Sequence, residues 1–158
     1  MKRSWRVGFS FGLTSGIITT LGLMVGLYSG THSQLVVIGG ILIIAIADAF
    51  SDSMSIHISQ EFENKITHKE VWESTFATFI FKFSFSSIFI IPVLFLDLKI
   101  AIMLCVIIGF FLLFLISLFI AKGRKVKAWK VICEHLIITA VVITITYYLG
   151  YYISMIFG

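Results

Sequence analysis

Five long apolar stretches dominate this chain of 158 residues and restrict the folds open to it. A helix needs about 20 mainly apolar residues to cross a bilayer. The stretches that meet this requirement are residues 8–28, 35–58, 73–96, 100–121 and 131–157. Only 13% of the chain is charged, about half the fraction usual in a soluble domain, and a membrane β-barrel would show short alternating strands instead. We therefore predict an all-α membrane protein with five transmembrane helices in one domain.

The distribution of Lys and Arg predicts how these helices are oriented. Basic residues gather on the cytoplasmic side of membrane proteins. Here they precede the first stretch and fill the connections 59–72 and 122–130, whereas the opposite side carries only Lys99. Five crossings place the N-terminus inside and the C-terminus outside. This integral, multi-pass protein would lie in the cell membrane of a prokaryote or an organelle membrane of a eukaryote. The basic excess predicts anionic lipid headgroups as neighbours, and not nucleic acid.

Two aspartates interrupt the second apolar stretch. Asp48 and Asp52 lie one helical turn apart, with their Cβ atoms about 6 Å from each other. Ser55 continues the same polar stripe at helical spacing. Ionisable groups at this depth are costly and usually functional. Carboxylate and hydroxyl oxygens suit ions such as Fe²⁺ and Mn²⁺, and close carboxylates hinder each other's ionisation. The pair therefore predicts a metal-binding site in a proton-coupled cation carrier.

Lys82 in the third stretch is the obvious counter-charge. It lies nine residues beyond Glu73, roughly 13 Å from the cytoplasmic end, and the two aspartates lie about 15 and 9 Å deep by the same helical rise. The depths match, which leaves two interpretations. Contact of Lys82 with both aspartates favours a structural ion cluster in a non-transporting membrane interaction or structural protein. An open, water-accessible carboxylate pair favours the carrier, in which a metal ion displaces Lys82.

The first stretch carries two series of glycines at every fourth position, and Ser15 and Thr19 bridge the two series. Small residues allow the backbones of membrane helices to approach closely. The series predict either packing inside one subunit or a homodimer interface through this helix. The glycines are at positions 8, 12, 16, 22, 26 and 30.

Other acidic residues lie near the cytoplasmic boundary. Glu134 and His135 begin the fifth stretch, and they are either solvated or line a cytoplasmic mouth. The connection 59–72 holds several glutamates and a histidine, a composition that either gathers metal ions or forms a solvated loop. The sequence contains no phosphate loop, zinc motif or Ser/His/Asp arrangement. Both membrane aspartates lie on one helix, which argues against an intramembrane aspartyl protease. We expect no enzyme activity and no resident cofactor.

Residues 11–22, Phe-Gly-Leu-Thr-Ser-Gly-Ile-Ile-Thr-Thr-Leu-Gly, resemble the first helix of the vacuolar iron transporter family, which typically reads Phe-Gly-x-Asn-Asp-Gly-Leu-x-Thr-Thr. Residues 51–55 are similar to its second-helix Gly-Glu-Tyr-x-Ser pattern. Ser84-Phe85, Pro92 and residues 146–150 also match at family spacing. The chain departs from the family in several places. Ser15 stands where the family has an aspartate and Asp48 where it has a methionine, Lys82 is foreign to the pattern, and the glutamate-rich domain between helices 2 and 3 is missing.

The resemblance implies a five-helix homodimer that exchanges Fe²⁺ or Mn²⁺ for protons. Combined with the residues themselves, it predicts a proton-coupled transporter of divalent metal cations. Asp48 and Asp52 are expected to bind the metal ion. The residues expected along the transport path are Ser15, Thr19, Ser55, Lys82 and Glu134.

Overall fold

The computed structural model describes residues 2–124 and 127–158 and contains helices but no strand within them. Helices α1, Arg3–Thr31, and α2, Gln34–Glu61, are followed by α3, His68–Ile88, and a short α4, Ile90–Phe95. Helices α5, Leu98–Arg124, and α6, Ala128–Phe157, complete the chain. With α3 and α4 taken as one span, five helical segments are long and apolar enough to cross a membrane. The prediction of an all-helical, five-span chain is thus confirmed to that extent.

The helices extend beyond the apolar stretches at almost every end. The connection predicted over 59–72 shrinks to residues 62–67 because α2 continues to Glu61 and α3 begins at His68. Thr67 starts α3 with a capping box, in which its hydroxyl accepts from the Glu70 N–H and the Glu70 carboxylate accepts from the Thr67 N–H. Such caps satisfy backbone groups that the helix itself leaves free. Hydropathy marks only the apolar part of a helix, so it could not reveal these polar turns.

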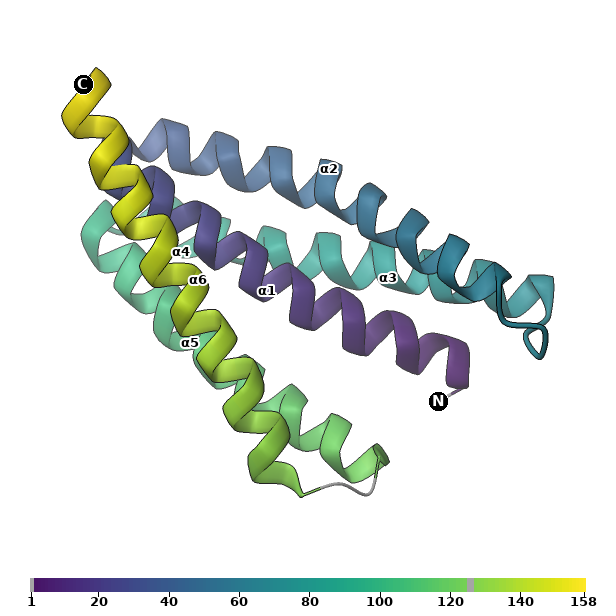
Figure 1. Ribbon diagram of the computed structural model, residues 1–158. Coiled ribbons are helices and arrows are strands. Elements are labelled where there is room, and N and C mark those ends of the chain that lie inside the picture. Colours follow the sequence, from purple (N-terminus) through teal and green to yellow (C-terminus); the bar gives the residue numbers. More distant parts are fainter. Residues whose placement is uncertain (1, 125–126) are drawn as a thin grey trace.

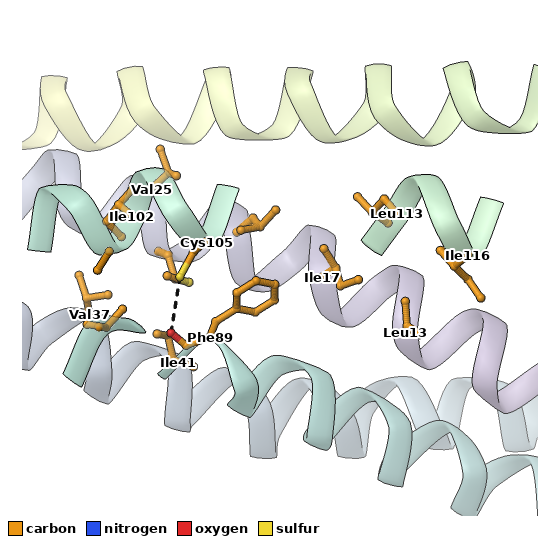
Figure 2. Close-up of a cluster of buried hydrophobic side chains, with 14 residues drawn as sticks. Leu13, Ile17, Val25, Val37, Ile41, Phe89, Ile102, Cys105, Leu113 and Ile116 are labelled. Atoms are coloured by element: carbon orange, nitrogen blue, oxygen red, sulfur yellow. Dashed lines mark hydrogen bonds between the residues drawn. The ribbon is translucent and has the colours of Figure 1, made fainter. Parts of the chain in front are cut away.

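The predicted helix over 73–96 is interrupted. Helix α3 ends at Ile88, and α4 begins at Ile90. The cause is Pro92, which lacks an N–H and whose ring clashes with the carbonyl four residues earlier, at Ile88. The bend lies within the main hydrophobic core, where Phe89 is 1% exposed and the Cys105 thiol lies 3.7 Å from its carbonyl oxygen, as Figure 2 shows.

Helix α1 is the centre of the bundle. It packs against α2, α3, α5 and α6, while α2 also packs on α3 and α5 on α6 (Figure 1). Its apolar side chains, including Leu13, Ile17 and Leu21, form the core together with residues of α2 and α5 (Figure 2). In contrast, α2 and α6 expose many large apolar side chains. A membrane helix can present such side chains to lipid.

The two glycine series of α1 lie against different helices of the same chain. A Cβ atom on Gly12 would lie 2.7 Å from the carbonyl oxygen of Thr78 in α3. A Cβ atom on Gly22 would lie 2.7 Å from a methyl group of Val142 in α6. Of the two interpretations of the glycines, packing inside one subunit is therefore the one that the structure displays. The homodimer through this helix stays a prediction from the resemblance, without the glycines as its support.

The basic segments that the structure describes gather at one end of the bundle. Arg3 of α1 pairs with Glu63 in the connection between α2 and α3, with 3.0 Å between nitrogen and oxygen. A Cβ atom on Gly123, near the end of α5, would meet the Arg6 guanidinium. The C-terminus lies at the opposite end (Figure 1), where Gly150 packs on Gly30. This agrees with an odd number of crossings. Lys125, counted among the basic residues of 122–130, lies outside the described residues.

The close approach of α1 and α3 predicts the effect of one added methyl group. Gly12→Ala should destabilise the protein by about 1–3 kcal/mol because the methyl group must displace α3 backbone. Gly39→Ala is the matched control, since a Cβ atom there meets nothing within 4 Å. Thermal unfolding in detergent should separate the two variants, and equal midpoints would show that the α1–α3 contact is not tightly packed.

Candidate functional site

A cluster of five polar side chains joins α1, α2 and α3 inside the span. We call it the Asp–Lys cluster; its members are Ser15, Thr19, Asp48, Asp52 and Lys82. The glycines of α1 make it possible, because the Lys82 side chain passes directly beneath that helix. A Cβ atom on Gly16 would lie 3.3 Å from Cγ of Lys82. The glycines of α1 therefore leave room for the Lys82 side chain and also allow close packing of the helices.

Lys82 lies at the centre of the cluster. Its Nζ lies 2.5 Å from Oδ2 of Asp48 and also pairs with Oδ2 of Asp52. It further lies 2.9 Å from the hydroxyl oxygen of Ser15. An ammonium has three N–H donors, and these three oxygens are enough to accept all of them. The burial of this cation is therefore compensated by partners from two other helices.

Two hydroxyls of α1 complete the carboxylate surroundings. Ser15 donates to Oδ2 of Asp52 over 2.6 Å. The Thr19 hydroxyl lies 2.9 Å from Oδ2 of Asp48 and 2.9 Å from the Ser15 carbonyl oxygen. Because a hydroxyl has one proton to donate, Thr19 bonds only one of these acceptors at a time. The oxygens of α1 and α2 together form a set of four side chains that suits a hard cation.

The members of the cluster differ in exposure: the cation is buried, and the two acids are partly exposed. The Lys82 side chain is 0% exposed, whereas those of Asp48 and Asp52 are 26% and 20% exposed. Asp48 and Thr19 line a cavity of about 830 Å³ between α1 and α2, whose other walls include Gly39 and Gly40. The three ionisable groups carry two negative charges and one positive charge when all are ionised. In that fully ionised form, the cluster carries one surplus negative charge beside this cavity.

The structure brings three of the predicted path residues together around the two aspartates and leaves two outside. Ser15, Thr19 and Lys82 contact the aspartates as described, but Ser55 does not. Its hydroxyl is exposed and donates to the Ser51 carbonyl of its own helix over 2.9 Å. The buried face of α2 runs along Ala45, Ala49, Ser53 and His57. The aspartates lie at the edge of this face, and Ser55 lies further round the helix, so Ser55 lies outside the Asp–Lys cluster.

Glu134 lies elsewhere as well. It lines a second cavity of about 630 Å³ between α1, α5 and α6, together with His135, Arg3 and Arg6. This cavity is distinct from the one beside Asp48. The two arginines make its mouth unfavourable for a metal cation. The structure therefore gives Glu134 no contact with the Asp–Lys cluster.

The acidic side chains near the connection between α2 and α3 are largely engaged in structural contacts. Glu73 accepts from Lys2 over 2.9 Å and from Ser4 over 2.7 Å, and Glu63 pairs with Arg3. Glu70 caps α3. Within residues 2–124 and 127–158, no group of three or more His, Cys, Asp or Glu side chains is placed to hold a metal ion. The expectation that these glutamates gather metal ions has no support in this geometry.

Sequence reasoning missed a second polar contact between α2 and α3. His57 is 7% exposed, and its Nδ1 lies 2.9 Å from the hydroxyl of Thr75. Its Nε2 lies 3.3 Å from a carboxylate oxygen of Glu61, one turn further along α2. The His-to-Glu spacing of four residues was the available signal. Thr75 comes from another helix, so the spacing along α2 gives no sign of this second partner.

The geometry predicts that Lys82 is the residue whose loss the fold tolerates least. Lys82→Met leaves two facing carboxylates without their cation, and breaking a buried ion pair typically costs about 3–5 kcal/mol. Adding Asp52→Asn to this variant should restore part of the stability by removing the repulsion. Lys99→Met, in the exposed first turn of α5, is the control. A thermal unfolding midpoint of Lys82→Met equal to that of the control would contradict the prediction.

A function for the Asp–Lys cluster has to be inferred from the chemistry of its side chains, because comparison with known proteins offers no guide. Searches of protein-family models, curated proteins and solved structures give no match to this chain. The resemblance to the vacuolar iron transporters therefore stays an expectation from the sequence.

Proposed function

We propose that this chain is a cation transporter whose binding site is the Asp48–Asp52 pair, with divalent iron or manganese as substrate and protons as the coupling ion. The observation that carries the proposal is the surplus carboxylate of the Asp–Lys cluster. A structural pair needs one acid for one base, yet here two aspartates face one lysine. The acids are also the exposed members and one of them lines a cavity.

The charge balance of the cluster links metal binding to a proton. Two carboxylates and one ammonium sum to a charge of −1. A divalent ion between the carboxylates gives −2 + 2 = 0 only if Lys82 is neutral, and +1 if Lys82 keeps its proton. Because uncompensated charge is costly away from water, binding of the metal favours release of the Lys82 proton. Lys82 would then act as the group that exchanges with the cargo.

The contacts of Lys82 define the resting state of this mechanism. The ammonium occupies the carboxylate oxygens that the metal ion would use, so the lysine must withdraw for the ion to bind. The Ser15 and Thr19 hydroxyls remain beside the acids as further oxygen ligands. Asp48 and Thr19 are reached first from the cavity between α1 and α2. The path we propose therefore runs along α1 and α2, and excludes Ser55 and Glu134.

A second candidate function is favoured by a specific observation. Lys82 contacts both aspartates, which is the arrangement expected of a structural ion cluster in a non-transporting membrane protein. In that case the cluster would fix α3 against α1 and α2, and the protein would act through interactions with other components. A buried ion pair by itself is weak evidence of stabilisation. Transport measurements on the wild-type protein separate the two candidates.

The proposed orientation places the N-terminus and the connection between α5 and α6 in the cytoplasm and the C-terminus outside, in a multi-pass membrane protein. Its support is the collection of Lys2, Arg3 and Arg6 at the same end of the bundle as the α2–α3 connection and the end of α5. Reporter fusions at the two termini should give opposite signals, as the positive-inside rule requires. Two termini on one side would remove a span and contradict the topology.

The transport test uses purified protein in liposomes with a pH gradient across the membrane. Wild type should take up Mn²⁺ or Fe²⁺, and Asp48→Asn or Asp52→Asn should lower the initial rate at least about tenfold. The reason is that an amide keeps the size of the side chain but loses the charge that neutralises the ion in a low dielectric. Asp97→Asn, in the exposed turn before α5, is the matched control and should leave uptake unchanged.

Calorimetry in buffers of different ionisation enthalpy should count about one proton released per metal ion bound at neutral pH. A folded wild type that moves neither metal under any proton gradient would end the carrier proposal and leave the structural candidate.

A further inference from the structure

We propose that the second cavity, between α1, α5 and α6, binds one anionic phospholipid, with the phosphate at Arg6 and the acyl chains along the apolar wall. The cavity has a volume of about 630 Å³ and lies at the basic end of the bundle. This site is independent of the Asp–Lys cluster and of any transport through it. Its lining divides into a charged entrance and an apolar interior.

Arg6 is the cation that the lining offers to an anion, although the acidic residue Glu134 belongs to the same lining. Arg3, the other arginine of the lining, is already paired with Glu63. Within the described part of the chain, Arg6 forms no ion pair and its guanidinium donates no hydrogen bond to another side chain. A guanidinium offers a planar set of donors that matches the oxygens of a phosphate. Lys122 and Lys130 lie exposed on the neighbouring helices at the same end, so the surrounding field also favours an anion.

The interior of the cavity is shaped for hydrocarbon. Val7 and Phe11 of α1 face Phe119 and Ile120 of α5 across it. From Arg3 to Thr14 the lining spans eleven residues of α1, about 16 Å at the rise of an α-helix. A free inorganic phosphate would use the arginine but leave this apolar length uncovered. A phospholipid fills both parts, and these helices are long and apolar enough to cross a membrane.

An unsatisfied hydroxyl lies at the inner end. Oγ1 of Thr14 is buried and has no hydrogen-bond partner among the described residues, and Thr14 lines this cavity. A buried hydroxyl without a partner costs roughly 1–3 kcal/mol. Thr14 lies eight residues beyond Arg6 on α1, about 12 Å at the rise of a helix, so a lipid whose phosphate lies at Arg6 places acyl-chain carbon beside this hydroxyl. The proposal therefore depends on Arg6 and the apolar wall, and Thr14 marks only the depth to which the cavity extends.

The experiment measures thermal unfolding of the full chain in a neutral detergent with added phosphatidylglycerol, phosphatidylcholine or inorganic phosphate. Phosphatidylglycerol should raise the unfolding midpoint by several degrees, and the other two additions should raise it by less than a third of that shift. Native mass spectrometry should show one retained phosphatidylglycerol per chain. Arg6→Gln should lose at least half of the shift, whereas Lys130→Gln, an equal charge change outside the lining, should keep most of it.

A second variant keeps the proposal testable if the Arg6→Gln protein does not fold. Ser10→Phe fills the cavity without changing charge, and it should also reduce the retained lipid at least threefold. Equal losses for Arg6→Gln and Lys130→Gln would show only general attraction of headgroups and overturn the proposal. A full shift with inorganic phosphate would assign the site to a free anion. A concentration-dependent dimer that phosphatidylglycerol neither stabilises nor accompanies would assign the cavity to a second copy of the chain.

Discussion

The placement of one ammonium group between two carboxylates is the interaction on which the interior of this bundle depends. Lys82 is wholly buried, and its partners come from α2, with a hydroxyl from α1. If the lysine were withdrawn, the two acids would repel each other where little water can screen them. The three helices are therefore joined by a polar contact as well as by apolar packing. Apolar surfaces alone give membrane helices little reason to prefer each other over lipid.

The same contact bears on both candidate functions, the structural cluster and the carrier, and the two functions make opposite demands on it. A cation held by all its partners is a good structural element, but a transporter must be able to release it. In the carrier that we propose, the surplus carboxylate is what favours exchange. A proton or a metal ion would take the place of the missing second base, and the exposed sides of Asp48 and Asp52 would admit either of them. The cluster would then alternate between an internal and an external cation.

Much of the fold could be predicted because hydropathy and helical length are local properties. The five spans and the matching depths of Asp48, Asp52 and Lys82 follow from counting residues along apolar stretches. The exclusion of Ser55 and Glu134 from the Asp–Lys cluster could not be predicted, because it depends on the rotation of each helix about its axis. His57 illustrates the same limit, since its partner Thr75 lies on a different helix. The glycines of α1 predict close helix contacts, but only the structure identifies α3 and α6 as the helices that they contact.

The order of α2 and α3 along the chain has a consequence for biogenesis. The two acids of α2 are synthesised before Lys82, and each Asp near the centre of a span disfavours insertion by about 2.5–3.5 kcal/mol. Only residues 62–67 separate the two helices, so α3 follows α2 out of the ribosome after a short delay. Entry of α2 and α3 together, as a hairpin, would bring the acids and their base into the bilayer already paired. The short connection thus favours paired insertion over the separate passage of a helix that carries two bare charges.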